Sequence, residues 1–274
     1  MAYLRASIKL ILFFILMFGF ALVSFFWKLT SKDALQRRRR YAWTTSQLSR
    51  LCLKLMNVTV DVKNYPKLDS QCLLISNHLG MLDILLKCSV QETLFITSYE
   101  MKEAPGLGAL TEMGGCLYVE RRSRANIHRE IENIRETLLE GFNVVLYPEG
   151  MSTNGERVYP FKKSLLMSVA GTGIPIVPVC LSFRKVNGED IHHKWRDHVC
   201  WYGDQSFPPA LWRLLQLHSV DAELHFFDPI FVHSEEERRA VAEHAHRLIS
   251  SHYQGIPVPQ ISQLIDDSGL LSST

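Results

Sequence analysis

The sequence predicts an α/β fold in which a sheet is flanked by helices and preceded by an N-terminal membrane helix. Near the N-terminus, residues 10–27 form an uncharged apolar run. From about residue 57 onward, short apolar segments alternate with segments of helical periodicity, which is typical of strands alternating with helices. The chain has 274 residues, of which 47% are hydrophobic, enough for one large domain with its own core.

The apolar run at residues 10–27 has the length of a membrane helix. Its eighteen residues carry no charge and end in Phe25, Phe26 and Trp27, aromatic residues that suit a membrane–water interface. No small-residue cleavage pattern follows, so the run favours a retained anchor over a cleaved signal peptide. A single transmembrane span and a monotopic helix both fit this pattern.

Basic residues lie mainly on the C-terminal side of this run. Lys28, Lys32 and the arginines at 37–40 outnumber Arg5 and Lys9 before it. The positive-inside rule therefore places the following domain in the cytoplasm. Such a cluster also attracts anionic lipid headgroups, by about 1 kcal/mol per basic residue near the surface. The net charge of +2 indicates no nucleic-acid partner.

We expect three parts along the chain: a membrane anchor at 1–28, a folded domain at 29–254 and a loosely ordered tail at 255–274. A helix over 33–56 has one apolar face, which packs on the core or lies on the membrane. The expected strands are 58–62, 71–76, 93–97, 115–119, 143–147, 174–182 and 220–227. The expected later helices are 81–90, 124–140, 162–171, 208–217 and 234–252.

The cysteines and histidines do not indicate a metal site. The six cysteines include no CxxC pair, and most lie within apolar runs, so we expect buried, reduced thiols rather than disulfides. The histidines lack cysteines or carboxylates at ligand spacing. The sequence therefore predicts no bound metal.

A histidine and a carboxylate follow the strand expected at 71–76. His78 falls in the turn after this strand, and Asp83 falls in the first turn of the next helix. Residues five apart would not meet within a helix, but Gly80 permits a turn that brings them together. The carboxylate would orient the imidazole, which could then take a proton from an attacking alcohol. A solvated turn with Asp83 as a helix cap is the alternative.

Two further runs end expected strands with polar residues. Residues 115–122 end in adjacent arginines; Arg121 offers a planar fork for phosphate oxygens, with a solvated basic face as the alternative. Residues 147–155 place Glu149 and Gly150 in a turn whose amides could face an acceptor headgroup or a developing oxyanion. Glu149 could bond an acceptor hydroxyl or align Arg121, and an ordinary turn is the alternative here.

Taken in order, these motifs resemble those of the glycerolipid acyltransferase superfamily, which includes the lysophosphatidic acid acyltransferases. The family shows N-H-x4-D, G-x-x-[FY]-[IV]-[DE]-R, [FY]-P-E-G and a Pro-bearing strand, and all four occur here in that order. The resemblance implies a mixed α/β sheet and transfer of an acyl group from acyl-CoA or acyl carrier protein to a lysolipid hydroxyl, without a further cofactor. It implies a catalytic pair, His78 and Asp83, and the acceptor-binding residues Gly115, Arg121, Glu149 and Gly150.

The sequence contains no G-x-S-x-G elbow, so the acceptor hydroxyl itself would be the nucleophile. Two departures from the family concern the acceptor: Gly80 replaces the usual serine, and residues 151–155 replace the Thr-Arg-Ser of phosphatidate-forming members. Residues 159–162 and 201–204 resemble members that acylate lyso-ornithine lipid or other lysophospholipids. We expect 1-acylglycerol-3-phosphate as acceptor, giving phosphatidate, with lyso-ornithine lipid as its rival. A lipid hydrolase and an inactive lipid-binding scaffold are the alternatives from other classes.

Overall fold

The sheet of this protein mixes parallel and antiparallel strands. The computed structural model describes residues 2–68, 70–120 and 125–257. Its strands are Val58–Lys63 (β1), Leu73–Ser76 (β2), Thr93–Ser98 (β3), Leu117–Val119 (β4), Asn143–Leu146 (β5), Ile176–Val186 (β6), Glu189–Asp190 (β7) and Val220–Phe226 (β8). The strand order is β1-β8-β6-β2-β5-β3-β4, with β7 paired to β6. β6 is antiparallel to β8 and β7, and the other pairs are parallel.

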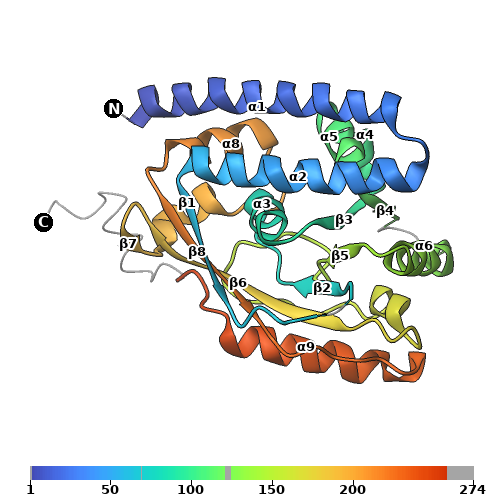
Figure 1. Cartoon of the computed structure of the whole chain (residues 1–274). Helices are drawn as coiled ribbons and strands as arrows, with labels where there is room; N and C mark the ends of the chain where they lie inside the picture. Colours follow the sequence, from blue (N-terminus) through green and yellow to red (C-terminus); the bar gives the residue numbers. More distant parts are fainter. Residues whose placement is uncertain (1, 69, 121–124, 258–274) are drawn as a thin grey trace, which may run out of the picture.

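Helices cover both faces of this sheet (Figure 1). The α-helices are Ala2–Thr30 (α1), Ala34–Met56 (α2), Met81–Val90 (α3), Tyr99–Glu103 (α4), Leu107–Met113 (α5), Ile127–Leu139 (α6), Arg196–Val199 (α7), Phe207–Gln216 (α8) and Arg238–His252 (α9). Short 3-10 helices in the described part of the chain are Leu165–Val169 (η1), His193–Trp195 (η2) and Glu235–Glu237 (η3). This mixed α/β sheet flanked by helices confirms the predicted fold class.

The sheet is buried on both faces, which explains why the first three residues of β2, Leu73 to Ile75, are all apolar. Side chains alternate along a strand, so Leu73 and Ile75 pack into the cluster that also contains Ile134 and Ala245 of α6 and α9. Leu74 packs into the other cluster, beneath α2, α3 and α8. Strands buried in this way read as apolar runs rather than alternating patterns. The polar residues that follow β2 are therefore presented at its carboxyl end.

Some expected elements differ from the observed ones. The helix expected at 162–171 is wrong, because only the single 3-10 turn η1 forms there and the chain turns away at Gly171, which has φ +69°. The short helices α4 and α5 were not expected. At the C-terminus, Ile256 is buried and its N–H donates to the Gly155 carbonyl at 2.7 Å, so the chain is held to the domain this far. Residues 258–274 lie outside the described part.

The N-terminal helix α1 is fastened to the domain by its own charged residues. Lys9 is buried, and its Nζ donates to the carbonyls of Met56 at 2.9 Å and Leu217 at 2.8 Å. Arg5 donates to the Gln216 carbonyl at 2.7 Å. These carbonyls belong to the C-terminal ends of α2 and α8, where backbone acceptors lack helical partners and the helix dipole attracts cations. At its other end, α1 is held by Trp27, whose indole donates to Thr44 of α2 at 3.0 Å.

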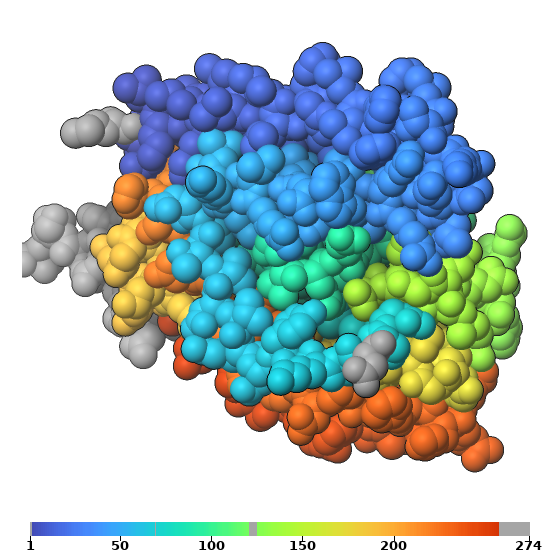
Figure 2. Space-filling model, in the orientation of Figure 1, coloured from blue at the N-terminus to red at the C-terminus, as the bar shows by residue number. Residues whose placement is uncertain are grey.

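The opposite face of α1 is apolar and exposed. Figure 2 shows this helix as a ridge along one edge of the molecule, beside α2. Its exposed large hydrophobic residues are Tyr3, Leu4, Ile8, Ile11, Leu12, Phe14, Ile15, Phe18, Leu22, Val23, Phe25, Phe26 and Leu29. By length and composition α1 is able to cross a membrane. Such an apolar face suggests association with a membrane.

Candidate active site

The turn after β2 carries His78, and the neighbouring strand β6 fixes where this turn begins. Asn77 is buried; its side-chain amide donates to the Leu181 carbonyl at 2.9 Å and accepts from the Leu181 N–H at 2.8 Å. This paired bond continues the β2–β6 ladder through a side chain at the point where the strand ends. The asparagine of the N-H-x4-D motif thus has a structural role that the sequence motif alone did not define.

The structure brings His78 and Asp83 together. The imidazole Nδ1 lies 2.7 Å from Asp83 Oδ2, which also accepts from the N–H groups of Leu79 at 2.6 Å and Gly80 at 3.2 Å. Asp83 is fully buried, whereas 17% of the His78 side chain is exposed. A carboxylate that accepts from Nδ1 leaves Nε2 as the basic nitrogen. The pair therefore has the arrangement of a general base with its orienting acid.

A tyrosine and a buried lysine lie behind this pair. The Tyr147 ring stacks on the His78 imidazole, with centroids 4.0 Å apart and planes at 11°. The Lys87 ammonium lies 5.1 Å from the Tyr147 centroid, one helical turn after Asp83. Burial lowers the pKa of Lys87 to about 8, and the charge of Asp83 acts in the opposite direction. Sequence reasoning missed Lys87; its signal was a single cation in an otherwise apolar stretch of α3.

Glu149 supports the backbone of the His78 turn. Its Oε1 accepts from the His78 N–H at 2.8 Å, and its Oε2 accepts from the Tyr159 N–H at 2.8 Å. Thr153 holds the same residue from the other side, because its N–H donates to the His78 carbonyl at 2.8 Å. Burial raises the pKa of Glu149 to about 7, although the hydrogen bonds from the two backbone N–H groups act to lower this pKa. From sequence, Glu149 was expected to bond an acceptor hydroxyl or to align Arg121. The structure adds a third role, which is to position His78.

Gly150 allows a lysine to approach the same turn. It has φ +77°, and a Cβ placed on it would lie 2.4 Å from Lys162 Nζ. The Lys162 backbone N–H donates to the Pro148 carbonyl at 2.8 Å, which fixes this approach. The ammonium of Lys162 therefore lies directly over the turn that holds His78. Lysine cations bind phosphate and carboxylate oxygens, so this group is placed to bind an anionic headgroup.

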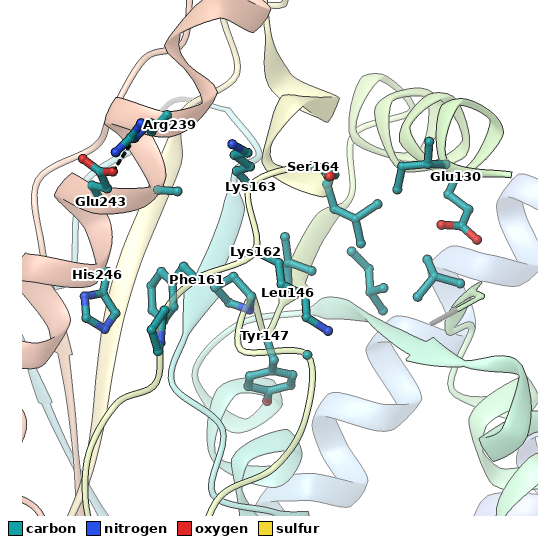
Figure 3. Close-up of a pocket in the computed structure, with 18 of the residues that line it drawn as sticks. Glu130, Leu146, Tyr147, Phe161, Lys162, Lys163, Ser164, Arg239, Glu243 and His246 are labelled. Atoms are coloured by element: carbon teal, nitrogen blue, oxygen red, sulfur yellow. Dashed lines mark hydrogen bonds and ion pairs between the residues drawn. The ribbon is translucent and has the colours of Figure 1, made fainter. Parts of the chain in front are cut away.

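A cavity of about 760 Å³ adjoins this turn at the ends of β4 and β5. We call it the β4–β5 cavity; α9 forms its far wall, as Figure 3 shows. Tyr147 and Gly150 line it on the side of the catalytic turn, and Lys162, Lys163 and the carboxylate of Glu130 also face it. Apolar side chains of β4, β5 and η1 complete the lining. A cavity of this size accommodates a substrate headgroup or part of an acyl donor.

Of the residues predicted to bind the acceptor, Gly115 does not line this cavity. Gly115 precedes β4 with φ +71°, and a Cβ on it would meet Leu94 at 3.1 Å and Arg38 at 3.6 Å. Its surroundings are thus β3 and α2 rather than the β4–β5 cavity. Arg121 lies outside the described residues, although Val119 and Glu120 before it line the cavity.

Comparison with known proteins decides the family. A family model described as Acyltransferase matches residues 57–182, which include His78, Asp83 and Glu149. A lyso-ornithine lipid O-acyltransferase of Brucella abortus is 30% identical over 190 residues, a match that covers 66% of this chain and 71% of that protein. The chain belongs to the Acyltransferase family.

Other similar proteins agree with this assignment. This acyltransferase is 27% identical over 198 residues to a 1-acyl-sn-glycerol-3-phosphate acyltransferase of Neisseria meningitidis serogroup B, covering 72% of this chain and 75% of that one. The crystal structure of PlsC, the 1-acyl-sn-glycerophosphate acyltransferase of Thermotoga maritima, has the same fold. Its TM-score is 0.60 at 19% identity, and the match covers 92% of this chain and 97% of that one.

The fold of this acyltransferase explains why glycine replaces the serine that is usual in the first motif. Gly80 has φ +139°, and a Cβ on it would lie 2.6 Å from the backbone nitrogen of Trp201 and 2.9 Å from its Cβ. The Trp201 N–H donates to the Leu79 carbonyl at 2.9 Å, so the segment at 201–204 is bonded to the catalytic turn. Gly80, which departs from the family motif, and residues 201–204, which resemble the lyso-ornithine lipid acyltransferases, are thus in direct contact.

Proposed function

We propose that this acyltransferase moves a fatty acyl group from a thioester donor to the free hydroxyl of a lysolipid. His78 Nε2 takes the proton of the acceptor hydroxyl as its oxygen attacks the thioester carbonyl carbon. The tetrahedral intermediate then collapses, the carbon–sulfur bond breaks, and the departing thiolate receives that proton. The donor is acyl-CoA or acyl carrier protein, and the thioester is already activated. The observation that carries this proposal is the 2.7 Å contact between His78 Nδ1 and the buried Asp83.

For the acceptor, we propose a lyso-ornithine-type lipid ahead of 1-acylglycerol-3-phosphate. The β4–β5 cavity is lined by Lys162 and Lys163 and by Glu130, whose Oε1 also accepts from the Glu120 N–H, so a headgroup carrying both a carboxylate and an ammonium meets charges of both signs. The phosphate dianion of 1-acylglycerol-3-phosphate would use the cations alone. The link between Gly80 and Trp201 and the similarity to the Brucella protein also support this choice.

The other acceptor, 1-acylglycerol-3-phosphate, is favoured by the Neisseria relative, whose match covers 72% of this chain against 66% for the Brucella protein. Arg121, predicted to bind a phosphate, would serve either acceptor, because guanidinium forks bind carboxylates as well as phosphates. The choice between the two acceptors therefore depends on the net charge of the headgroup that the cavity prefers. A panel of acceptors measures this preference directly.

We further propose that the enzyme is monotopic and works on the cytoplasmic surface of a membrane. Both ends of α1 contact the same domain, through Lys9 and Trp27. A helix held in this way lies along the domain rather than leaving it. Its apolar face would enter the lipid, and the basic residues Lys28 and Lys32 would contact anionic headgroups. Lysolipid and donor would then meet at His78 from the membrane and the aqueous side, respectively.

The proposal is tested by incubating labelled acyl-CoA or acyl carrier protein with the purified enzyme and a panel of lysolipids. We expect a new diacylated product only when a lysolipid is present, with lyso-ornithine lipid giving the highest kcat/KM. Free fatty acid released without dependence on an acceptor would indicate a hydrolase instead. Lipid binding without turnover for any donor and acceptor would indicate a scaffold.

A further inference from the structure

A cluster of two histidines and one glutamate lies between β8 and the end of α9. Glu223 and His225 are two residues apart on β8, so their side chains leave the same face of the strand. His252 is the last residue of α9 and packs against them. One potential ligand atom from each residue lies within 4.8 Å of the other two. We infer that these three side chains form a binding site for a divalent transition-metal ion such as Zn²⁺.

The ligand atoms of these three side chains would bind a metal ion after moving slightly closer to one another. The imidazoles of His225 and His252 lie with centroids 3.8 Å apart, and His252 Nε2 is 3.3 Å from Glu223 Oε1. Tetrahedral zinc with ligands at about 2.0–2.1 Å separates those ligands by about 3.3 Å. Rotations that move the atoms by about 1 Å would therefore complete the coordination, and His252 has this freedom at a helix terminus.

The surroundings orient these ligands. Phe227 contacts both rings, with centroids 4.9 Å from His225 and 5.8 Å from His252. Asn64 Nδ2 lies 3.2 Å from His225 Nε2; with a metal on Nδ1 this Nε2 would carry the proton, and the Asn64 amide, turned about its own axis, would accept it through its oxygen. Contacts of this kind around metal ligands set ring orientation and affinity. Arg184 also pairs with Glu223 Oε1, so the ion would share this carboxylate with a guanidinium.

The ligand types select the ion. Two imidazoles and one carboxylate favour zinc, copper or nickel over the oxygen-seeking calcium and magnesium ions. The ion would join the end of α9 to β8. Because Arg239, Glu243 and His246 of α9 line the β4–β5 cavity, the metal would stabilise one wall of that cavity. Among the described residues, no hydrogen bond or ring contact joins this cluster to His78, so the ion is given no part in the reaction.

The test is zinc binding to the full chain, purified without a histidine tag and stripped with a chelator that is then removed. Calorimetry or equilibrium dialysis with ZnCl₂ should show one bound ion in the wild type. The double variant His225→Asn/His252→Asn should bind at least about tenfold more weakly, and Glu223→Gln should also weaken binding. The matched control is His192→Asn/His193→Asn, which removes another pair of neighbouring rings, 4.0 Å apart, and should leave affinity unchanged.

Two further measurements distinguish this site from others and from loss of folding. Cobalt(II) should give a visible spectrum of nitrogen and oxygen ligation without a thiolate charge-transfer band. Zinc should slow amide exchange at the end of α9 in the wild type only. The inference is overturned if zinc affinity is unchanged in a folded double variant, if the wild type binds no zinc, or if cobalt shows thiolate ligation. None of these outcomes depends on acyl transfer, so the proposed function is judged separately.

Discussion

His78 is held at three points, and each uses a different residue. Its ring is oriented by Asp83, its N–H by Glu149 and its carbonyl by Thr153. These residues come from two segments, α3 and the loop after β5, that meet at the carboxyl ends of β2 and β5. The imidazole is therefore fixed in position and tautomer before any substrate binds, which is the condition for efficient proton transfer.

Asp83→Asn tests the orienting role of the carboxylate. Asparagine keeps the size of the side chain but loses the charge that stabilises the imidazolium and selects its tautomer. We expect kcat to fall by roughly 10³–10⁴, with the enzyme still folded. Steady-state acyl transfer and thermal unfolding measure the two effects. Asp61→Asn, at an exposed position on β1, is the control, and a kcat within about tenfold of wild type for Asp83→Asn would contradict the orienting role.

Gly80→Ser restores the residue that is usual in the family and should nevertheless damage this enzyme. The new side chain would clash with the Trp201 backbone and adopt an unfavourable φ of +139°. We expect a loss of about 2–3 kcal/mol in unfolding free energy together with lower activity. Gly188→Ser is the matched control, because Gly188 also has positive φ, +85°, but open space around it. Equal losses for the two variants would show that the contact with Trp201 does not matter.

Glu149 should make stability depend on pH. Its pKa rises from 4.5 to about 7 on folding, so the folded state binds the proton more tightly. Unfolding free energy should therefore fall as pH rises from about 4.5 to about 7, by on the order of 3 kcal/mol from this group. Glu149→Gln should remove that slope, while exposed Glu136→Gln keeps it. Denaturant unfolding at pH 5 and pH 7.5 compares them, and an unchanged slope in Glu149→Gln would refute this assignment.

At the scale of elements, Lys9 helps to hold α1 on the domain, together with the apolar packing of Ala6 and Phe13. The Lys9 ammonium satisfies carbonyls at the ends of two helices. Lys9→Met should leave these buried acceptors unpaired and cost about 2–3 kcal/mol of stability. Lys28→Met, at the exposed far end of the same helix, should cost little. Thermal unfolding in one detergent provides the comparison, and equal melting temperatures for both variants would mean that Lys9 does not fasten α1.

The elements predicted well from sequence are those with long, regular patterns. β2, β5 and α3 were found close to their observed bounds because each joins an apolar run to a turn residue. α4 and α5 were missed because helices of five and seven residues are too short to show a helical period. The expected helix at 162–171 failed because apolar residues there pack on α6 in a single 3-10 turn.

In the candidate active site too, the contacts between residues close in sequence were predicted and those between distant segments were not. His78 and Asp83 are close in sequence, so local turn geometry sufficed to predict that they meet. Trp201, Lys162 and the partners of His252 reach their places only through contacts between distant segments. No spacing in the sequence reveals such contacts, because they depend on strand order and on how the helices pack across the sheet.

At the scale of the whole molecule, the α1 ridge and the catalytic turn define how the substrates would meet. The β4–β5 cavity adjoins the turn, and α1 with its apolar face runs along one edge of the molecule (Figures 1 and 2). The account therefore predicts that a lysolipid held in a membrane delivers its hydroxyl to one imidazole. Flotation with vesicles tests the membrane step: binding should increase with the anionic lipid fraction and decrease with salt. Equal binding to neutral vesicles would contradict the role of the basic residues.

The most direct measurement of the central claim is acyl transfer by His78→Ala. The account predicts that kcat falls by roughly 10³ or more, because the general base is lost. Melting temperature and lysolipid binding should stay close to those of the wild type, since Glu149, Thr153 and Asp83 hold the backbone of the turn. A folded His78→Ala enzyme that transfers acyl groups at near wild-type rates would contradict the claim.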